Sequence, residues 1–166
     1  MSEKEYLDKI ENFLRHNNCK TWREVIPDDC EFWEKPYRVD LVFYRDDFGF
    51  IGVEAKEINT LGSGGIIAQA FEQLKNYREF TYFKGNRLNR WCMTFAISKM
   101  NQEFLNKNMV TLTFIKNFFK AYDISILEFI EYNNPLWTRI TIDSLTKDVI
   151  TIKEEEKEDG ESISGI

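Results

Sequence analysis

The chain has 166 residues, of which 43% are hydrophobic and 30% are charged, and its formal net charge is −6. These proportions are typical of a globular domain and exclude a fibrous or wholly disordered chain. No apolar run approaches the roughly 20 residues that span a bilayer, and the N-terminus lacks the apolar stretch of a signal peptide. We therefore expect a cytoplasmic protein with no membrane partner.

Hydrophobic periodicity and turn residues predict a succession of helices and strands. In chain order these are a helix at 3–15, strands at 21–26, 37–45 and 48–57, a helix at 66–80, a strand at 91–98, a helix at 111–122, a strand at 124–131, and a hairpin of 138–143 with 149–153. The strands at 37–45 and 48–57 should form a hairpin through Asp46 and Asp47. A glycine-rich loop at 61–65 and a basic polar connector at 84–90 complete the pattern.

Adjacent antiparallel strands combined with crossover helices indicate an α/β (α+β) domain, with a single mixed β-sheet flanked by helices and a C-terminal β-hairpin. We expect one domain over residues 1–152. The remaining residues, 153–166, contain six acids and two lysines and leave the body of the chain with a charge of only about −2. They show no apolar periodicity, so we predict a disordered acidic tail, and favour a solubilising role over one as a DNA-mimicking or partner-binding arm.

The sequence offers few residues for catalysis by thiol or histidine groups. The three cysteines, Cys19, Cys30 and Cys92, are widely separated and form no CxxC pair, which argues against a cysteine zinc site. The single histidine, His16, lies in a polar stretch typical of a solvated surface residue. Any catalysis should therefore rest on carboxylates, lysine and a hard metal ion.

Two neighbouring strands carry the residues that suit such chemistry. Asp40 interrupts an apolar strand, and Glu54 and Lys56 lie two apart, hence on one face of the next strand. The hairpin would bring Asp40 beside them. Two close carboxylates oppose each other's ionisation unless a cation lies between them, and oxygen ligands suit Mg²⁺ or Mn²⁺. A lysine there could orient, polarise or deprotonate a water; the alternative is that these are ordinary solvent-facing charges.

The spacing of these residues resembles the PD-(D/E)xK nuclease superfamily. Asp40 precedes Glu54-x-Lys56 by 14 residues, and Val39 stands where that family usually has proline. A second motif, Gln73-x-x-x-Tyr77, is similar to a helix of RecB-like nucleases and of the N-terminal nuclease domain in motor subunits of type I restriction enzymes. The resemblance covers residues 3–131 and implies a restriction-endonuclease-like core.

The resemblance implies a metal-dependent deoxyribonuclease that hydrolyses DNA phosphodiester bonds through a metal-activated water. Asp40, Glu54 and the Ala55 carbonyl would bind Mg²⁺ or Mn²⁺, and Lys56 would position or activate the water. Gln73 and Tyr77 would support the site. An acid from the first helix often completes such a metal site; Glu3, which shares the helical phase of Ile10 and Leu14, is favoured over Glu5 and Glu11.

DNA is the expected partner, and basic residues on and after the second helix are the candidates for binding it. The predicted contacts are Gln69, Lys75, Arg78, Lys84, Arg87 and Arg90. The alternative for this stretch is a solvated basic loop. For the whole chain the rival is a catalytically silent module of the same fold that binds DNA or a protein. The oligomeric state is left open between a monomer, a homodimer and a larger restriction or repair assembly.

Overall fold

The computed structural model describes residues 2–28, 38–58, 64–77, 82–97, 102–131, 138–144 and 147–154. Its helices are α1 (Glu3–His16), α2 (Gly64–Tyr77) and α3 (Gln102–Ala121). Its strands are β1 (Lys20–Val25), β2 (Val39–Arg45), β3 (Gly49–Ile58), β4 (Tyr82–Phe83), β5 (Asn86–Ile97), β6 (Ser125–Ile130), β7 (Arg139–Asp143) and β8 (Ile150–Lys153). Two predicted boundaries shift: Lys153, assigned to the acidic tail at 153–166, belongs to β8, and Gly64 and Gly65 of the glycine-rich loop at 61–65 belong to α2. Residues 61–63 and 155–166 lie outside the described residues.

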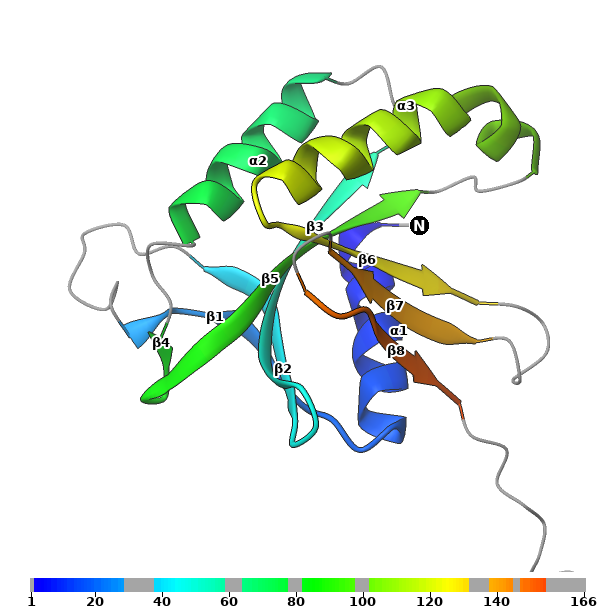
Figure 1. Ribbon diagram of the computed structural model, residues 1–166. Helices are drawn as coiled ribbons and strands as arrows, with labels where there is room; N and C mark the ends of the chain where they lie inside the picture. Colours follow the sequence, from blue (N-terminus) through cyan, green and yellow to red (C-terminus); the bar gives the residue numbers. More distant parts are fainter. Residues whose placement is uncertain are drawn as a thin grey trace, which may run out of the picture.

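A large curled mixed sheet forms the framework, with strand order β1-β2-β3-β5-β6-β7-β8 and with β4 paired to β5 (Figure 1). The pairs β3–β5 and β5–β6 are parallel, and α2 and α3 are the crossovers between them. The outer pairs on both sides, β1–β2–β3 and β6–β7–β8, are antiparallel. The predicted mixed α/β architecture and both hairpins are therefore confirmed.

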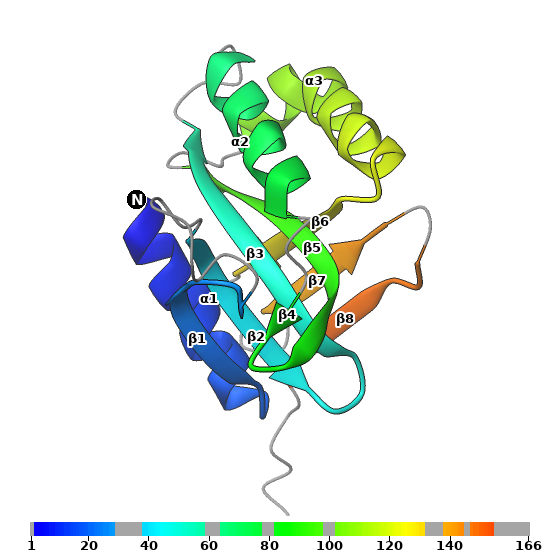
Figure 2. The same ribbon diagram turned by 90° about the vertical axis from the view of Figure 1, so that its left-hand side faces the viewer.

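The helices cover opposite faces of this sheet. In two perpendicular views α1 lies on one side, and α2 and α3 lie together on the other (Figures 1 and 2). Each side has its own hydrophobic cluster, one around α1 and the other around α2 and α3. The central strands are thus covered on both faces, as expected for strands joined by helical crossovers.

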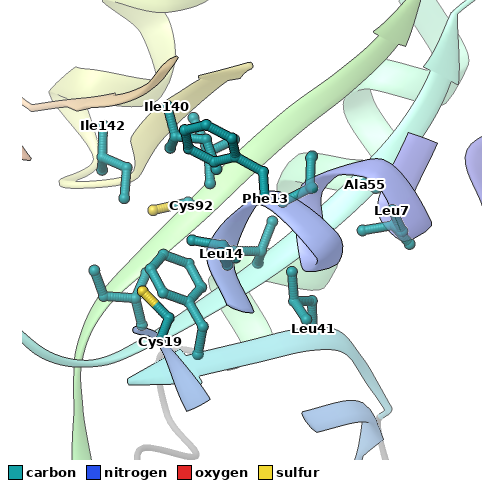
Figure 3. Close-up of a cluster of buried hydrophobic side chains, with 14 of the residues drawn as sticks. Leu7, Phe13, Leu14, Cys19, Leu41, Ala55, Cys92, Ile140 and Ile142 are labelled. Atoms are coloured by element: carbon teal, nitrogen blue, oxygen red, sulfur yellow. The ribbon is translucent and has the colours of Figure 1, made fainter. Parts of the chain in front are cut away.

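Helix α1 begins and ends where its sequence predicts. Ser2 caps it: the Ser2 Oγ accepts a hydrogen bond from the Glu5 backbone N–H, and the Glu5 carboxylate accepts one from the Ser2 N–H. Its apolar face packs beneath the sheet, and Figure 3 shows Leu7, Phe13 and Leu14 beside Leu41, Ala55 and Cys92 from the central strands. This face anchors the first turn of α1, which carries Glu3.

Two sequence predictions need correction. The polar segment at 84–90 is no connector: Lys84 and Gly85 form a tight turn with positive φ angles of 48° and 75°, and β5 already begins at Asn86. Asp28 holds this turn by accepting hydrogen bonds from both backbone N–H groups. Helix α3 begins at Gln102, nine residues before the predicted start at 111. Asn106 and Asn108, both weak helix formers, interrupt the periodicity there.

Candidate active site

Strand alternation decides which side chains of β3 reach the candidate site. Val53 and Ala55 are fully buried in the cluster around α1, and Figure 3 shows Ala55 directed into it. Glu54 and Lys56 therefore project to the opposite face, toward α2. In β2, Leu41 likewise belongs to the α1 cluster, which leaves Asp40 on the face of Glu54.

The register of the β2–β3 hairpin brings the two acids together. The ladder ends at the pair of Leu41 and Val53, and Asp40 and Glu54 are the next residues on the two strands. They are close enough that the charge of Asp40 raises the pKa of Glu54. The sequence prediction that Asp40, Glu54 and Lys56 share one face is confirmed by this arrangement.

Carboxylates also cap the backbone of β3 where its pairing with β2 ends. The Ala55 N–H donates to Asp40 Oδ2 at 2.8 Å, and the Glu57 N–H donates to Glu3 Oε2 at 3.3 Å. Alternate N–H groups on one strand edge are about 7 Å apart, so the two carboxylates are neighbours along this edge. The structure thus brings Glu3 beside the site, whereas Glu5 is occupied by capping α1.

Burial makes the ionised form of Glu54 costly. Its residue is only 3% exposed, its Oε1 lies 3.4 Å from Lys56 Nζ, and its Oε2 is buried without a hydrogen-bond partner. Burial first, and then the negative charge of Asp40, raise the pKa of Glu54 to about 8, while Lys56 acts in the opposite direction. At neutral pH without a cation, Glu54 is therefore mostly protonated.

The same environment acts on Asp40. Burial raises the pKa of Asp40, the Ala55 N–H lowers it, and the charge of Glu3 raises it further. Because Asp40 and Glu54 face each other, their protonation is linked, and the pair binds its protons as a unit. A cation placed between them would favour ionisation of both carboxyl groups.

The donor set fits a hard divalent cation that retains water. Glu54 Oε2 is an orphaned buried oxygen, and Asp40 opposite it is a second carboxylate. Within the described ranges, no three His, Cys, Asp or Glu side chains gather closely enough to enclose a metal ion. Two carboxylates with a backbone carbonyl and waters suit Mg²⁺, which commonly keeps several waters, better than a closed site.

A further acid near the site, Glu24 of β1, was missed by sequence reasoning. Arg23 pairs with Leu41 and Val25 with Val39, so Glu24 lies opposite Asp40 on the side away from Glu54. Glu24 has a positive φ of 52° and is exposed, and its charge contributes to the raised pKa of Asp40. Only the register between β1 and β2 reveals this row of acids across three strands.

Helix α2 packs on the site face of β3 and carries the predicted supporting residues. Gln73 is half-buried and its Oε1 is buried without a hydrogen-bond partner, whereas Gln69 is exposed. The side chain of Tyr77 and the whole of Arg78 lie outside the described residues. Of the two described glutamines, Gln73 is therefore the one that reaches toward the sheet.

The predicted basic surface is only partly reproduced. Lys75, Lys84 and Arg87 are exposed, and the Lys84 ammonium lies 5.3 Å from the ring centroid of Trp22. Arg90 is a correction: it is buried in β5, and its Nη1 has no hydrogen-bond partner. The polar composition of its neighbours suggested a surface loop, but β5 continues through this segment and turns Arg90 inward.

Other nucleophiles stand apart from this site. Burial raises the pKa of the Cys19 thiol to about 11 and that of the Cys92 thiol to about 12, so neither forms a reactive thiolate at neutral pH. Cys30 lies outside the described residues. His16 is exposed at the end of α1, where its Nδ1 lies 2.7 Å from the Asn12 carbonyl oxygen.

Comparisons with protein-family models, with curated proteins and with solved structures found no match to this chain. None of the helices that the structure describes is both long and apolar enough to cross a membrane. The function is therefore inferred from the geometry of Asp40, Glu54 and Lys56.

Proposed function

We propose that this domain is a metal-dependent deoxyribonuclease that hydrolyses DNA phosphodiester bonds. The observation that carries the proposal is Glu54, a buried acid opposite Asp40 with one oxygen left without a partner. Folding an acid into such a place is costly, and a bound cation would offset the cost. The adjacent Lys56 ammonium adds the positive charge that a phosphate requires.

Each residue has a distinct part in this proposal. Asp40 and Glu54, with the Ala55 carbonyl, would hold Mg²⁺ or Mn²⁺, which when bound polarises a phosphate and lowers the pKa of a bound water. Lys56 is partly exposed and paired with Glu54, so its ammonium would hold the attacking water or a phosphate oxygen at the mouth of the site. Gln73 of α2, which packs on the site face of β3, would help to hold β3 in position.

The fold supports the same proposal at a coarser level. We infer a restriction-endonuclease-like core from the β2–β3 hairpin, the parallel β3–β5 pair and the crossover helix α2 between them. DNA would approach on the face of α2, where exposed Lys75 and the Lys84–Arg87 hairpin supply positive charge for phosphates.

A direct test measures cleavage of a labelled DNA and metal binding in the same set of variants. Wild-type protein should cleave with Mg²⁺ or Mn²⁺ and stop in EDTA. Lys56→Ala should keep metal binding by calorimetry but lose about 10²-fold in rate, because it lacks only the group that positions the water. Asp40→Asn should lose both metal binding and cleavage.

Lys9→Ala serves as the matched control, because Lys9 is a lysine on the outer side of α1, where it forms a surface ion pair with Glu131. Undiminished cleavage in EDTA, or equal rates for Lys56→Ala and wild type, would overturn the proposal. DNA binding without cleavage in any divalent metal would instead identify the chain as a silent nuclease-fold module.

A further inference from the structure

The outer side of α3 carries a continuous row of large exposed apolar side chains. Val110, Phe114, Phe118 and Tyr122, the last just beyond the helix end, are 84%, 69%, 39% and 47% exposed. They recur every four residues and so form one i±4 ridge. The rings of Phe114 and Phe118 stack with centroids 6.5 Å apart, and those of Phe118 and Tyr122 lie 5.4 Å apart.

This row is not part of the core. Among the described side chains of α3, Ile115 and Phe119 pack into the cluster on the sheet. Phe71 of α2 contacts the inner edges of Phe118 and Tyr122, with centroid distances of 5.0 Å and 4.8 Å, which holds the row in place. The outer part of the row therefore faces water, although a patch of this kind ordinarily marks an interaction site.

Helix geometry places a second i±4 row beside this ridge. It consists of Thr113, Asn117 and Ala121, which are smaller, uncharged and exposed, and we call this row the groove. Large and small rows thus lie side by side. Among the described side chains of the helix, the charged ones nearest to the rows, Lys116 and Lys120, are turned away to ion pairs with Glu128 and Asp143. One helix face presents both halves of a ridge-into-groove contact.

We propose that this face of α3 joins two copies of the chain in a two-fold symmetric dimer. Under a two-fold axis, the ridge of each copy enters the groove of the other, which is the packing of two i±4 ridges at an interhelical angle of about −50°. A second copy fits better than a nucleic acid or a charged partner, because the described side chains of both rows carry no charge. This dimer does not depend on nuclease activity.

The available area sets the strength of the contact. With about 200 Å² for each ring, the three aromatic residues leave roughly 300 Å² exposed, or roughly 600 Å² in two copies. Val110 and the small row bring the buried total toward the roughly 1,200 Å² at which specific interfaces begin. The dimer is therefore weak and concentration-dependent.

Sedimentation equilibrium of the full chain tests the proposal. The average mass of the wild type should rise toward twice the monomer mass as the concentration increases, whereas Phe114→Glu should stay monomeric over the same range. Ile26→Glu is the matched control, because Ile26 is 37% exposed but follows β1, the edge strand of the sheet, and is not on α3. The Ile26→Glu variant should therefore dimerise like the wild type. Circular dichroism verifies that both variants are folded.

A cysteine placed in the groove tests the geometry. Asn117→Cys should be cross-linked into a dimer by a short bis-maleimide, which can span the helix–helix contact, and Asn12→Cys on the exposed side of α1 should not. A wild type that stays monomeric at all concentrations, or a Phe114→Glu variant that dimerises as well as wild type, would overturn the proposal. No excess of linked dimer in Asn117→Cys over Asn12→Cys would overturn the two-fold arrangement.

Discussion

Replacing Glu54 by glutamine should stabilise the metal-free protein, and increasingly so as the pH rises. The ordinary pKa of a glutamate is near 4.5, and burial beside Asp40 raises the pKa of Glu54 to about 8 in the folded state. The folded state therefore binds this proton more tightly than the unfolded chain does. The stability that the bound proton provides is fully present below pH 4.5 and is lost as the pH rises to about 8.

The magnitude follows from the distance between the two pKa values. Each pH unit between them costs about 1.36 kcal/mol, so the loss amounts to about 3 kcal/mol at pH 7 and cannot exceed about 5 kcal/mol. For a domain of this size that corresponds to a shift in melting temperature of roughly 6–12 °C at pH 7. Glutamine has nearly the same shape but no charge, so the variant escapes this cost.

The assay is urea unfolding followed by circular dichroism, in EDTA, at several values of pH between 5 and 8. Glu54→Gln and wild type should be within about 1 kcal/mol of each other at pH 5, and the variant should be more stable by about 3 kcal/mol at pH 7. Glu72→Gln, an exposed position on α2, is the control and should show a constant difference from wild type. Adding Mg²⁺ should stabilise the wild type alone, because ligand binding to the folded state raises its stability.

A stability difference between Glu54→Gln and wild type that does not change from pH 5 to pH 8 would refute this reasoning. So would a variant that is less stable than wild type at pH 8 in EDTA. Either result would mean that the Glu54 carboxylate is adequately solvated or paired in the folded protein and needs no cation.

Two further substitutions probe the surroundings of the site. Gly52→Ala should lower the free energy of unfolding by about 1–3 kcal/mol, because a Cβ at this position would lie 2.5 Å from Cζ3 of Trp91. In urea unfolding, the same substitution should cost less in a Trp91→Leu background. An equal cost in the two backgrounds would disprove the clash. Glu3→Gln keeps an acceptor for the Glu57 N–H but removes a negative charge close to the site. The loss of this charge should weaken Mn²⁺ binding by on the order of 1 kcal/mol, which calorimetry would show as an affinity about 5- to 10-fold lower. Glu5→Gln, in the same turn of α1, is its control, and equal affinities in the two variants would exclude Glu3 from the site.

The sequence by itself determined the parts of the site that depend on local periodicity. Because side chains alternate along a strand, Glu54 and Lys56 had to share one face, and the turn at Asp46 and Asp47 had to bring Asp40 alongside. The phase of the first helix likewise selected Glu3 among its acids. These are short-range relations, which the order of residues fixes before any packing occurs.

Only the tertiary structure decided the features that depend on register and coverage. The position of Glu24 beside Asp40, the burial of Arg90 and the hairpin of β4 with β5 all follow from which strands pair and how they align. The same holds for the raised pKa of Glu54 and for the exposed ridge of α3, because burial depends on what the rest of the chain places over a residue. A local pattern assigns a side chain to a face, but distant segments determine whether that face meets protein, water or a partner.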